Sequence, residues 1–563
     1  MSPLRPFVLA AAFACAGLPA LAQGVSGAYL AGRVAETDRN FSEAANRFAE
    51  ALVMDKENPQ IMQGLVGANI ALGELDIVAP VAQDMVDLGV GSQLAHMALL
   101  AHAAKTGDWD TIITMIDEER GVGPLVDGLS RAWALVGKGE MSAALEAFDA
   151  VAQEDGLNSF GMYHKALALA LVGDLEGANA IFSGETSGRM QITRRGAMAS
   201  IEVLSQLDRN DDAIQLIDST FGPELDPALR QMKEQMAAGE RLPFTHVRNA
   251  TDGMAEVYFA VASALEGEAG PDYTLLYARV AQYLRPEHVD ATLLSADLLD
   301  VMGRYDLAEA TYRLLPKDDP AFHAAELGRA DALRSDGKGD AAIEVLQSLA
   351  KTHSDLPIVH LTLGDFYRAE EQYKEAVAAY DKAISLYENP EDARWFAYYT
   401  RGIAYERLGE WDSAESDFRK ALELSPGQPQ VLNYLGYSLV EKDIKLDEAL
   451  GMIEQAVATS PNSGHIVDSL GWVLFRLGRY EEAAAQLERA AELMPVDPIV
   501  NDHLGDGYWA VGRKIEARFQ WHRALSFDPE EADAERIRRK LEVGLDQVLA
   551  DEGAAPIEVA NGD

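Results

Sequence analysis

The sequence predicts an all-α fold: an α-solenoid of stacked helical hairpins, coiled into a superhelix and divided into two sub-arrays. Apolar residues recur with the i, i+3/i+4 spacing of core-facing helices, and whole hairpins recur about every 34 residues. One such hairpin is too small to bury its apolar face alone, so neighbouring hairpins must stack to share a core. Stacking also explains how a chain of 563 residues folds without one large globular core.

The clearest hairpin lies between residues 466 and 495. Its first helix carries an apolar stripe and ends at Gly478, after which Glu481 opens a second helix, where a carboxylate suits the positive end of the helix dipole. Pro495 cannot continue a helix and ends the unit. Gly471 and the alanines are small, so we expect the two helices to approach closely. The residues predicted to face the core of this hairpin are Ile466, Leu470, Val473, Leu474, Leu477, Ala483, Leu487 and Ala490.

The same order of residues recurs in five near-register copies between residues 357 and 531. The glycines that mark these copies are Gly364, Gly402, Gly436, Gly471 and Gly505. This pattern resembles the tetratricopeptide repeat, whose signature is Leu-Gly, a Tyr three residues later, and then spaced Ala, aromatic, Ala and Pro. The resemblance implies paired antiparallel helices that form a superhelix with a protein-binding concave groove.

The remaining segments are assigned from turn signals and composition. Residues 241–253 contain Pro243 and several turn formers without a helical period, which predicts a break or bend. Residues 532–550 are charge-rich and amphipathic, which favours a solvating helix that caps an open array. The predicted organisation is a signal peptide at 1–22, a degenerate N-terminal repeat array at 23–240, the break at 241–253, a C-terminal array at 254–531, the capping helix at 532–550 and a disordered acidic tail at 551–563.

The charge balance argues against nucleic acid or an anionic membrane surface as the main partner. The chain has 48 Lys and Arg against 91 Asp and Glu, a formal net charge of -43, whereas both of those partners require basic surfaces.

The first 22 residues have the pattern of a secretory signal peptide. Arg5 precedes an apolar run from Phe7 to Leu18, and an A-x-A site precedes Gln23. No other apolar run is long enough to span a membrane. The only cysteine, Cys15, lies in a poor match to a lipoprotein box. We therefore expect cleavage after residue 22 and a periplasmic location, with an outer-membrane lipoprotein anchored through Cys15 as the alternative.

The sequence contains no motif of a catalytic or cofactor site. It lacks H-E-x-x-H, G-x-S-x-G, G-x-x-x-x-G-K-[ST] and G-x-G-x-x-G, and its 11 histidines are scattered. We expect a protein that is not an enzyme and uses no cofactor and no metal.

The resemblance instead implies binding residues on the first helix of each C-terminal hairpin. Aromatic and polar groups interleave there, which suits an extended peptide or a partner helix, and the acids favour a basic partner. The alternative is that the aromatic residues simply pack between repeats. The candidate partner-binding residues are Asn433, Tyr434, Tyr437, Asp468, Trp472, Phe475, Arg476, Asp502, His503, Asp506 and Trp509.

The whole chain resembles the long secreted bacterial proteins of this repeat family. These include periplasmic adaptor lipoproteins that bring a carboxy-terminal processing protease together with cell-wall hydrolases. The resemblance implies a non-catalytic periplasmic scaffold that binds protein partners, such as an adaptor for a cell-envelope protease. The alternative function is a subunit of an envelope-assembly, export or secretion machinery.

Overall fold

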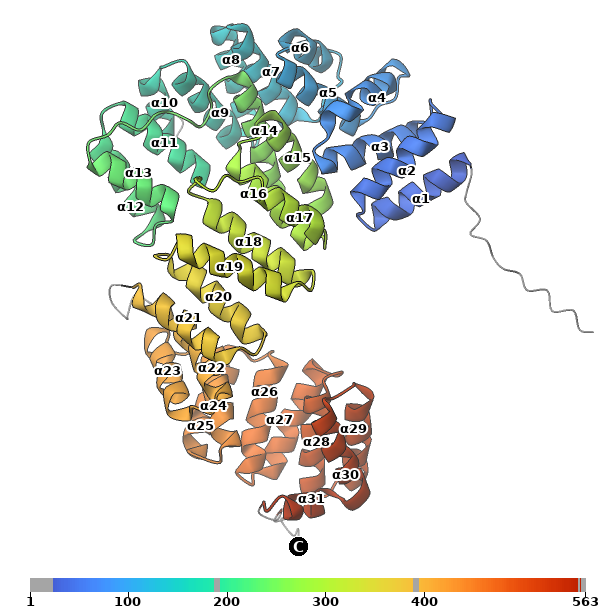
Figure 1. Ribbon diagram of the computed structural model, residues 1–563, viewed down its shortest axis with the longest axis vertical. Helices are drawn as coiled ribbons and strands as arrows, with labels where there is room; N and C mark the ends of the chain where they lie inside the picture. The colour runs from blue at the N-terminus through green and yellow to red at the C-terminus, as the bar shows by residue number, and fades with distance from the viewer. Residues whose placement is uncertain (1–23, 187–192, 388–393, 555–556, 558–563) are drawn as a thin grey trace, which may run out of the picture. The chain divides into compact units, whose positions relative to one another are not determined.

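The structure, a computed structural model, describes residues 24–186, 193–387, 394–554 and 557. Every regular element in these residues is an α-helix, and most successive helices pair into antiparallel hairpins (Figure 1). The chain forms two compact units, Met1–Val345 (unit 1) and Leu346–Asp563 (unit 2). The prediction of an all-α solenoid of stacked hairpins is confirmed.

The division between the units falls inside α19 (Gly339–Thr352). The other helices of unit 1 are α1 (Val25–Thr37), α2 (Phe41–Met54), α3 (Pro59–Leu72), α4 (Leu75–Asp87), α5 (Gln93–Thr106), α6 (Trp109–Asp117), α7 (Pro124–Lys138), α8 (Met141–Gln153), α9 (Asn158–Leu171), α10 (Leu175–Phe182), α11 (Arg194–Gln206), α12 (Asn210–Phe221), α13 (Pro227–Ala237), α14 (Ala250–Leu265), α15 (Pro271–Leu284), α16 (Val289–Val301), α17 (Tyr305–Tyr312) and α18 (Phe322–Ser335).

The helices of unit 2 are α20 (Pro357–Ala369), α21 (Tyr373–Ser385), α22 (Trp395–Arg407), α23 (Trp411–Leu424), α24 (Pro429–Glu441), α25 (Leu446–Thr459), α26 (Gly464–Arg476), α27 (Tyr480–Leu493), α28 (Pro498–Ala510), α29 (Lys514–Ser526), α30 (Glu531–Val543) and α31 (Leu545–Asp551).

A glycine on the first helix of a hairpin faces a large side chain on the second. A Cβ added to Gly505 of α28 would lie 2.3 Å from the indole nitrogen of Trp521 on α29, a residue that is fully buried. A Cβ added to Gly471 of α26 would lie 2.5 Å from Leu487 on α27. These distances are too short for a side chain, so the close approach predicted for Gly471 is confirmed. In these two hairpins the glycine and the bulky residue form one packing contact.

The inner surface of unit 1 is covered by helices of the same unit. The first helices α3, α5, α7 and α9 form this surface, and α14 and α15 pack against them (Figure 1). Trp133 of α7 is fully buried, and a Cβ added to Gly253 of α14 would lie 2.3 Å from its ring. Unit 1 is therefore a solenoid whose inner surface is already occupied.

Cationic side chains hold this arrangement at the ends of helices. Arg279 of α15 donates to the carbonyl oxygen of Ala71, near the end of α3, at 3.1 Å. Lys105 of α5 donates to the carbonyl oxygens of Tyr283 and Leu284, at the end of α15, at 2.8 and 3.1 Å. Cations suit the negative end of a helix dipole, so these contacts stabilise the packing of α15 on the N-terminal hairpins.

The predicted break at 241–253 does not coincide with the division into compact units. The preceding helix ends at Ala237, and helices resume at Ala250 rather than at the predicted Met254. The chain then turns back over the N-terminal hairpins, so residues on both sides of the break share one core. The division lies further on, at Val345.

The predicted capping helix at 532–550 is two helices, α30 and α31. They meet at Gly544, whose φ of 85° lies outside the helical region. One face of the cap is buried, through Ile537, Lys540 and Leu545. This face packs onto the last repeat, as the amphipathic pattern of a capping segment requires.

Two predicted segments fall largely outside the described residues. The signal peptide at 1–22, with Cys15, lies outside them, and so do residues 555–556 and 558–563 of the predicted tail. In the part of the chain that the structure describes, no helix is both long and apolar enough to cross a bilayer.

Replacing Gly505 by alanine should destabilise unit 2 by about 1–3 kcal/mol, because the new methyl group would overlap the buried ring of Trp521. The matched control is Gly451→Ala in α25, where the added Cβ would meet nothing within 4 Å. This control should stabilise the helix by up to about 1 kcal/mol. Urea unfolding of both variants measures the difference. Equal stabilities would show that the close approach at Gly505 is misplaced.

Candidate functional site: the groove of unit 2

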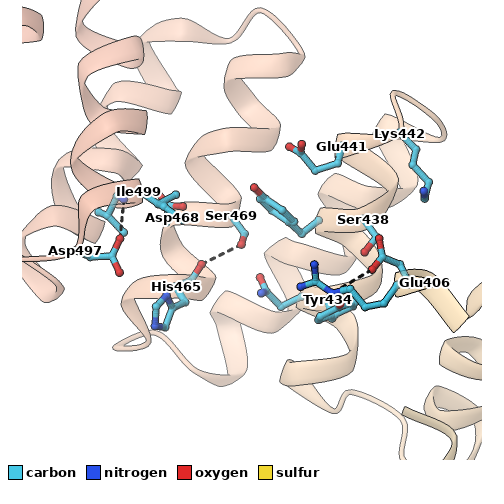
Figure 2. A pocket seen from close by; sticks show the side chains of 14 residues that line it. Glu406, Tyr434, Ser438, Glu441, Lys442, His465, Asp468, Ser469, Asp497 and Ile499 are labelled. Carbon is cyan, nitrogen blue, oxygen red and sulfur yellow. Dashed lines mark hydrogen bonds and ion pairs between the residues drawn. The ribbon is translucent and has the colours of Figure 1, made fainter. Parts of the chain in front are cut away.

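The first helices α22, α24, α26 and α28 line a cavity of about 510 Å³ (Figure 2). A second cavity, of about 380 Å³, shares Tyr437, Glu441 and Ile499 with the first and extends to α30. The two cavities together are called the unit 2 groove here. The first is lined by Glu406, Arg407, Asn433, Tyr434, Tyr437, Ser438, Glu441, Lys442, His465, Asp468, Ser469, Asp497, Ile499 and Val500.

The helical period explains why these side chains reach the groove. On α24, Leu435 and Leu439 lie on the apolar stripe and are fully buried in the core of unit 2. Asn433, Tyr437 and Glu441 follow one another at i, i+4 spacing, which puts them on a different face of the same helix. Burial of the stripe therefore turns the aromatic and polar face toward the groove.

The structure brings eight of the eleven predicted residues to the groove. Asn433, Tyr434, Tyr437 and Asp468 line the first cavity. Tyr437 also lines the second, together with Trp472, Arg476, Asp502 and His503. The lining does not include Phe475, Asp506 and Trp509. The role of these residues in binding a partner stays a prediction.

Trp472 is held between neighbouring repeats. Its ring stacks on Phe475 at 5.1 Å and on His503 of α28 at 4.2 Å, and its Nε1 donates to Glu441 of α24 at 2.8 Å. Only 9% of Trp472 is exposed. Trp472 and Phe475 therefore pack between repeats, which is the alternative that the sequence left open for these aromatic residues.

Trp509 lies under the C-terminal cap and not on an open groove. Its Nε1 donates to Asp546 at 3.0 Å, and a Cβ added to Gly544 would lie 2.7 Å from its ring. The bend between α30 and α31 therefore covers the indole, and a role of Trp509 in binding a partner stays a prediction. Repeat spacing could not reveal this, since the covering residues lie beyond the repeats.

Asp502 and Asp506 are neutralised inside unit 2. Lys540 of α30 is fully buried, and its Nζ donates to both oxygens of Asp502 at 2.9 and 2.8 Å and to Asp506 at 2.8 Å. The indole nitrogen of Trp521 donates to the other oxygen of Asp506 at 3.0 Å. The expectation that these two acids attract a basic partner is therefore corrected.

Replacing Lys540 by methionine should destabilise unit 2 by about 3–5 kcal/mol, because Asp502 and Asp506 would lose the buried cation that donates hydrogen bonds to both of them. The matched control is Arg538→Met on the same helix, where both partners of the ion pair with Glu531 are exposed. That change should cost no more than about 1 kcal/mol. Urea unfolding compares the two variants, and similar losses would contradict the buried role of Lys540.

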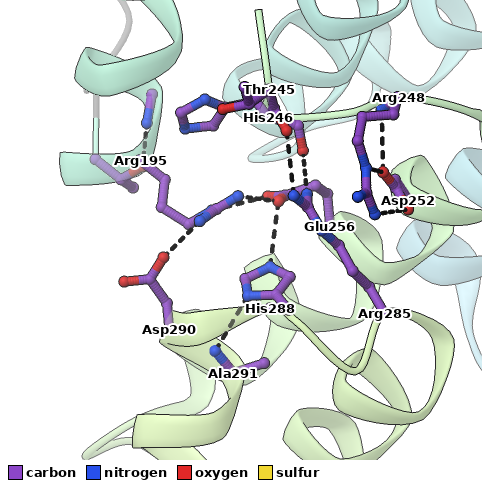
Figure 3. A network of polar contacts seen from close by, with 12 residues as sticks. Arg195, Thr245, His246, Arg248, Asp252, Glu256, Arg285, His288, Asp290 and Ala291 are labelled. Carbon is purple, nitrogen blue, oxygen red and sulfur yellow. Dashed lines mark hydrogen bonds and ion pairs between the residues drawn. The ribbon is translucent and has the colours of Figure 1, made fainter. Parts of the chain in front are cut away.

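Unit 1 holds a separate buried polar network between α11, α14 and α16 (Figure 3). Glu256 of α14 is 1% exposed, accepts from Nε of Arg195 at 3.1 Å and lies 3.2 Å from Nε2 of His288. Arg195 also pairs with Asp290. Burial by itself would raise the pKa of Glu256, but Arg195 and His288 hold that pKa well below its usual value.

The same network fastens the irregular segment that precedes α14. Glu202 of α11 accepts from the backbone nitrogen of Thr245 at 2.8 Å and from its hydroxyl at 2.7 Å, and it lies 3.0 Å from Nδ1 of His246. These contacts join elements of unit 1 to each other, so we interpret the network as structural. Sequence analysis missed it because acidic residues are common along the whole chain and these partners are far apart in sequence.

His164 is a buried neutral histidine in the same unit. It is fully buried, and its Nδ1 accepts from the indole nitrogen of Trp133 at 3.1 Å. Burial lowers the pKa of His164 from its ordinary value of 6.5 to about 4. In the folded protein this ring is therefore protonated only at a lower pH than in the unfolded chain.

Unit 1 should lose stability on acidification because the unfolded chain binds a proton at His164 before the folded chain does. The stability is present above pH 6.5 and is lost as the pH falls toward about 4. The contribution of His164 reaches about 3 kcal/mol. His164→Gln should flatten this dependence, whereas His522→Gln, at an exposed position of unit 2, should not. Hydrogen exchange of α7 and α9 measures the effect, and parallel pH profiles would contradict it.

Family comparisons agree with the geometry. Residues 293–357, 355–426 and 468–495 match the sequence profiles of the tetratricopeptide repeat. These segments are tetratricopeptide repeats. Such repeats are protein-binding scaffolds, typically without catalytic activity. Within the described residues, no group of three or more His, Cys, Asp or Glu side chains is arranged to hold a metal ion.

Relatives with these repeats match only part of the chain. A tetratricopeptide-repeat-containing protein of Pseudomonas aeruginosa is 28% identical over 159 residues, which cover 28% of this chain and 26% of that protein. A photosystem I assembly protein of Synechococcus is 31% identical over 112 residues, which cover 18% of this chain and 64% of that protein. The chain thus spans less than two thirds of the length of either relative.

Solved structures align over longer stretches at lower identity. The APC/C hetero-tetramer Cut9-Hcn1 is 16% identical, covering 92% of this chain and 96% of that chain with a TM-score of 0.38. At this identity and TM-score, the likeness adds nothing to the helical-repeat architecture described above.

Proposed function

We propose that this protein is a non-catalytic scaffold that binds protein partners in the unit 2 groove. The observation that carries the proposal is the pair of adjacent cavities, of about 510 and 380 Å³, lined by the first helices of successive helical hairpins. Tyr434 and Tyr437 supply apolar area there, and Asn433 and Asp468 supply hydrogen-bonding groups. An aromatic surface with a few placed polar groups suits an extended peptide.

Unit 2 is a better candidate than unit 1 for this groove. In unit 1, α14 and α15 already cover the first helices α3, α5, α7 and α9. The corresponding first helices of unit 2 line the cavities instead. A partner of unit 1 would therefore have to use another face of that unit.

The proposed compartment is the periplasm, and the proposed role is that of an adaptor for a cell-envelope protease. Residues 1–22 support the compartment through their charged start, apolar middle and A-x-A site. The resemblance to long secreted bacterial proteins with these repeats supports the adaptor. A subunit of an envelope-assembly, export or secretion machinery would use the same groove and is the second candidate.

A photo-crosslinking amino acid placed at Tyr437 in the full-length protein should capture a defined envelope protein. The same amino acid at Phe519, an exposed position on the second helix α29, is the control and should capture none. Mass spectrometry of the captured product identifies a protease or an assembly component. Capture only from Phe519 would overturn the groove as the binding site.

The cells used for crosslinking also test the compartment, through the N-terminal residue of the mature protein and the cell fraction that contains it. The mature protein should begin at Gln23 and be released with the soluble periplasmic fraction. A lipid-modified Cys15 would replace this location with an outer-membrane anchor, and a retained leader with a cytoplasmic location would overturn the periplasmic role.

A further inference from the structure

The acids predicted to face the groove differ in whether their carboxylate oxygens already have hydrogen-bond partners. Asp502 and Asp506 are both occupied by Lys540. Asp468 of α26 has its Oδ2 2.9 Å from Nδ1 of His503, and within the described residues its Oδ1 has no hydrogen-bond partner, although the side chain is only 8% exposed. A buried acceptor without a partner is destabilising, so this oxygen requires a donor.

Asn433 of α24 brings a second such acceptor to the same cavity. Its Oδ1 is buried and also lacks a partner among the residues that the structure describes. Asn433 and Asp468 both line the first cavity. Asp468 is labelled in Figure 2. Two unsatisfied acceptors on one cavity favour a ligand that donates hydrogen bonds over one that accepts them.

The cations at the wall of this cavity are engaged elsewhere. The Nζ of Lys442 lies 4.9 Å from the centre of the Trp411 ring. The guanidinium of Arg407 lies 3.8 Å from the carboxylate of Glu406. Neither contact supplies a donor to Oδ1 of Asp468. His503 contacts only Oδ2; burial by itself would lower the pKa of this imidazole, but Asp468 raises it above its ordinary value. The site that remains open to a ligand donor is therefore Oδ1.

Tyr437 lies beside two negatively charged side chains of the groove, Glu441 and Asp468. Burial raises the pKa of its hydroxyl, and the nearby charges of Glu441 and Asp468 raise it further. The tyrosine ring is half-buried at the wall shared by both cavities. An aromatic face beside a carboxylate attracts a cation through the ring quadrupole as well as through charge.

We propose that the first cavity of the unit 2 groove selects a basic side chain, arginine or lysine, in an extended segment of the partner protein. The cation donates to Oδ1 of Asp468 and Oδ1 of Asn433 beside the ring of Tyr437. This inference rests on the proposed function and adds the chemical class of the partner segment. A protein segment is favoured over a small free cation because the cavity of about 510 Å³ exceeds one side chain and adjoins the second cavity.

The test uses the full-length protein and short fluorescein-labelled peptides with randomised flanks. Their fixed central residue is arginine, lysine, norleucine or glutamate, and binding is measured by fluorescence anisotropy. The arginine and lysine peptides should bind at least about tenfold more tightly than the norleucine peptides, and the glutamate peptides should bind least. Spermidine and arginine amide, used as free cations, should displace the peptides only at much higher concentration.

Three variants assign the selectivity to named residues. Asp468→Asn should weaken the arginine peptides about tenfold and bring them close to the norleucine peptides. Asn433→Ala removes the second acceptor without changing a charge and should weaken both basic peptides by a smaller factor. Asp447→Asn removes the same charge at an exposed position of the second helix α25 and should leave binding unchanged. Thermal melting of each variant separates a binding loss from unfolding.

The outcomes separate this inference from the proposed function. Equal binding of arginine and norleucine peptides, or a full retention of selectivity in Asp468→Asn, would overturn the basic-residue site. If crosslinking from Tyr437 still captured a partner in that case, the groove would stand as the binding site. Spermidine as potent as the peptides would overturn the choice of a protein segment. No peptide binding and no crosslink would refute both proposals.

Discussion

The contact between a glycine on one helix and a large side chain on the next is the constraint on which the rest of this structure depends. At Gly505 and Trp521, as at Gly471 and Leu487, the first helix lies so close to the second that no Cβ fits between them. This approach fixes which face of the first helix turns into the core of the hairpin. Its remaining face must then line the inner surface of the solenoid, where a partner or another helix can pack.

The two units use that inner surface differently. In unit 1, α14 and α15 return over the N-terminal hairpins, and Arg279 and Lys105 tie the packing to the ends of helices α3 and α15. In unit 2 the corresponding surface forms cavities, and α30 closes only their far end. The same repeat chemistry thus gives a covered surface in one unit and an accessible groove in the other.

The charge around each buried acid is set by the cation paired with it and not by the net charge of the whole chain. The formal net charge of -43 describes mostly solvated surface, whereas Glu256 and Asp506 are buried beside Arg195 and Lys540. An unpaired acid would be costly in such places, and most buried acids therefore carry a cation of their own. Within the described residues, Asp468 and Asp300 each have one buried oxygen without a hydrogen-bond partner, and of these two acids only Asp468 lines the unit 2 groove.

The sequence by itself determined the hairpins and the face that each first helix presents, because both follow from spacing over a few residues. The resemblance to tetratricopeptide repeats, applied through the Leu-Gly register, then placed Asn433, Tyr437 and Asp468 on the groove side of these helices, and all three line the first cavity. Only the tertiary structure decided that Trp509 lies under Asp546, 37 residues later, and that Arg195 reaches Glu256 across 61 residues. Such contacts depend on how the chain turns back after its repeats end, and no local period encodes that path.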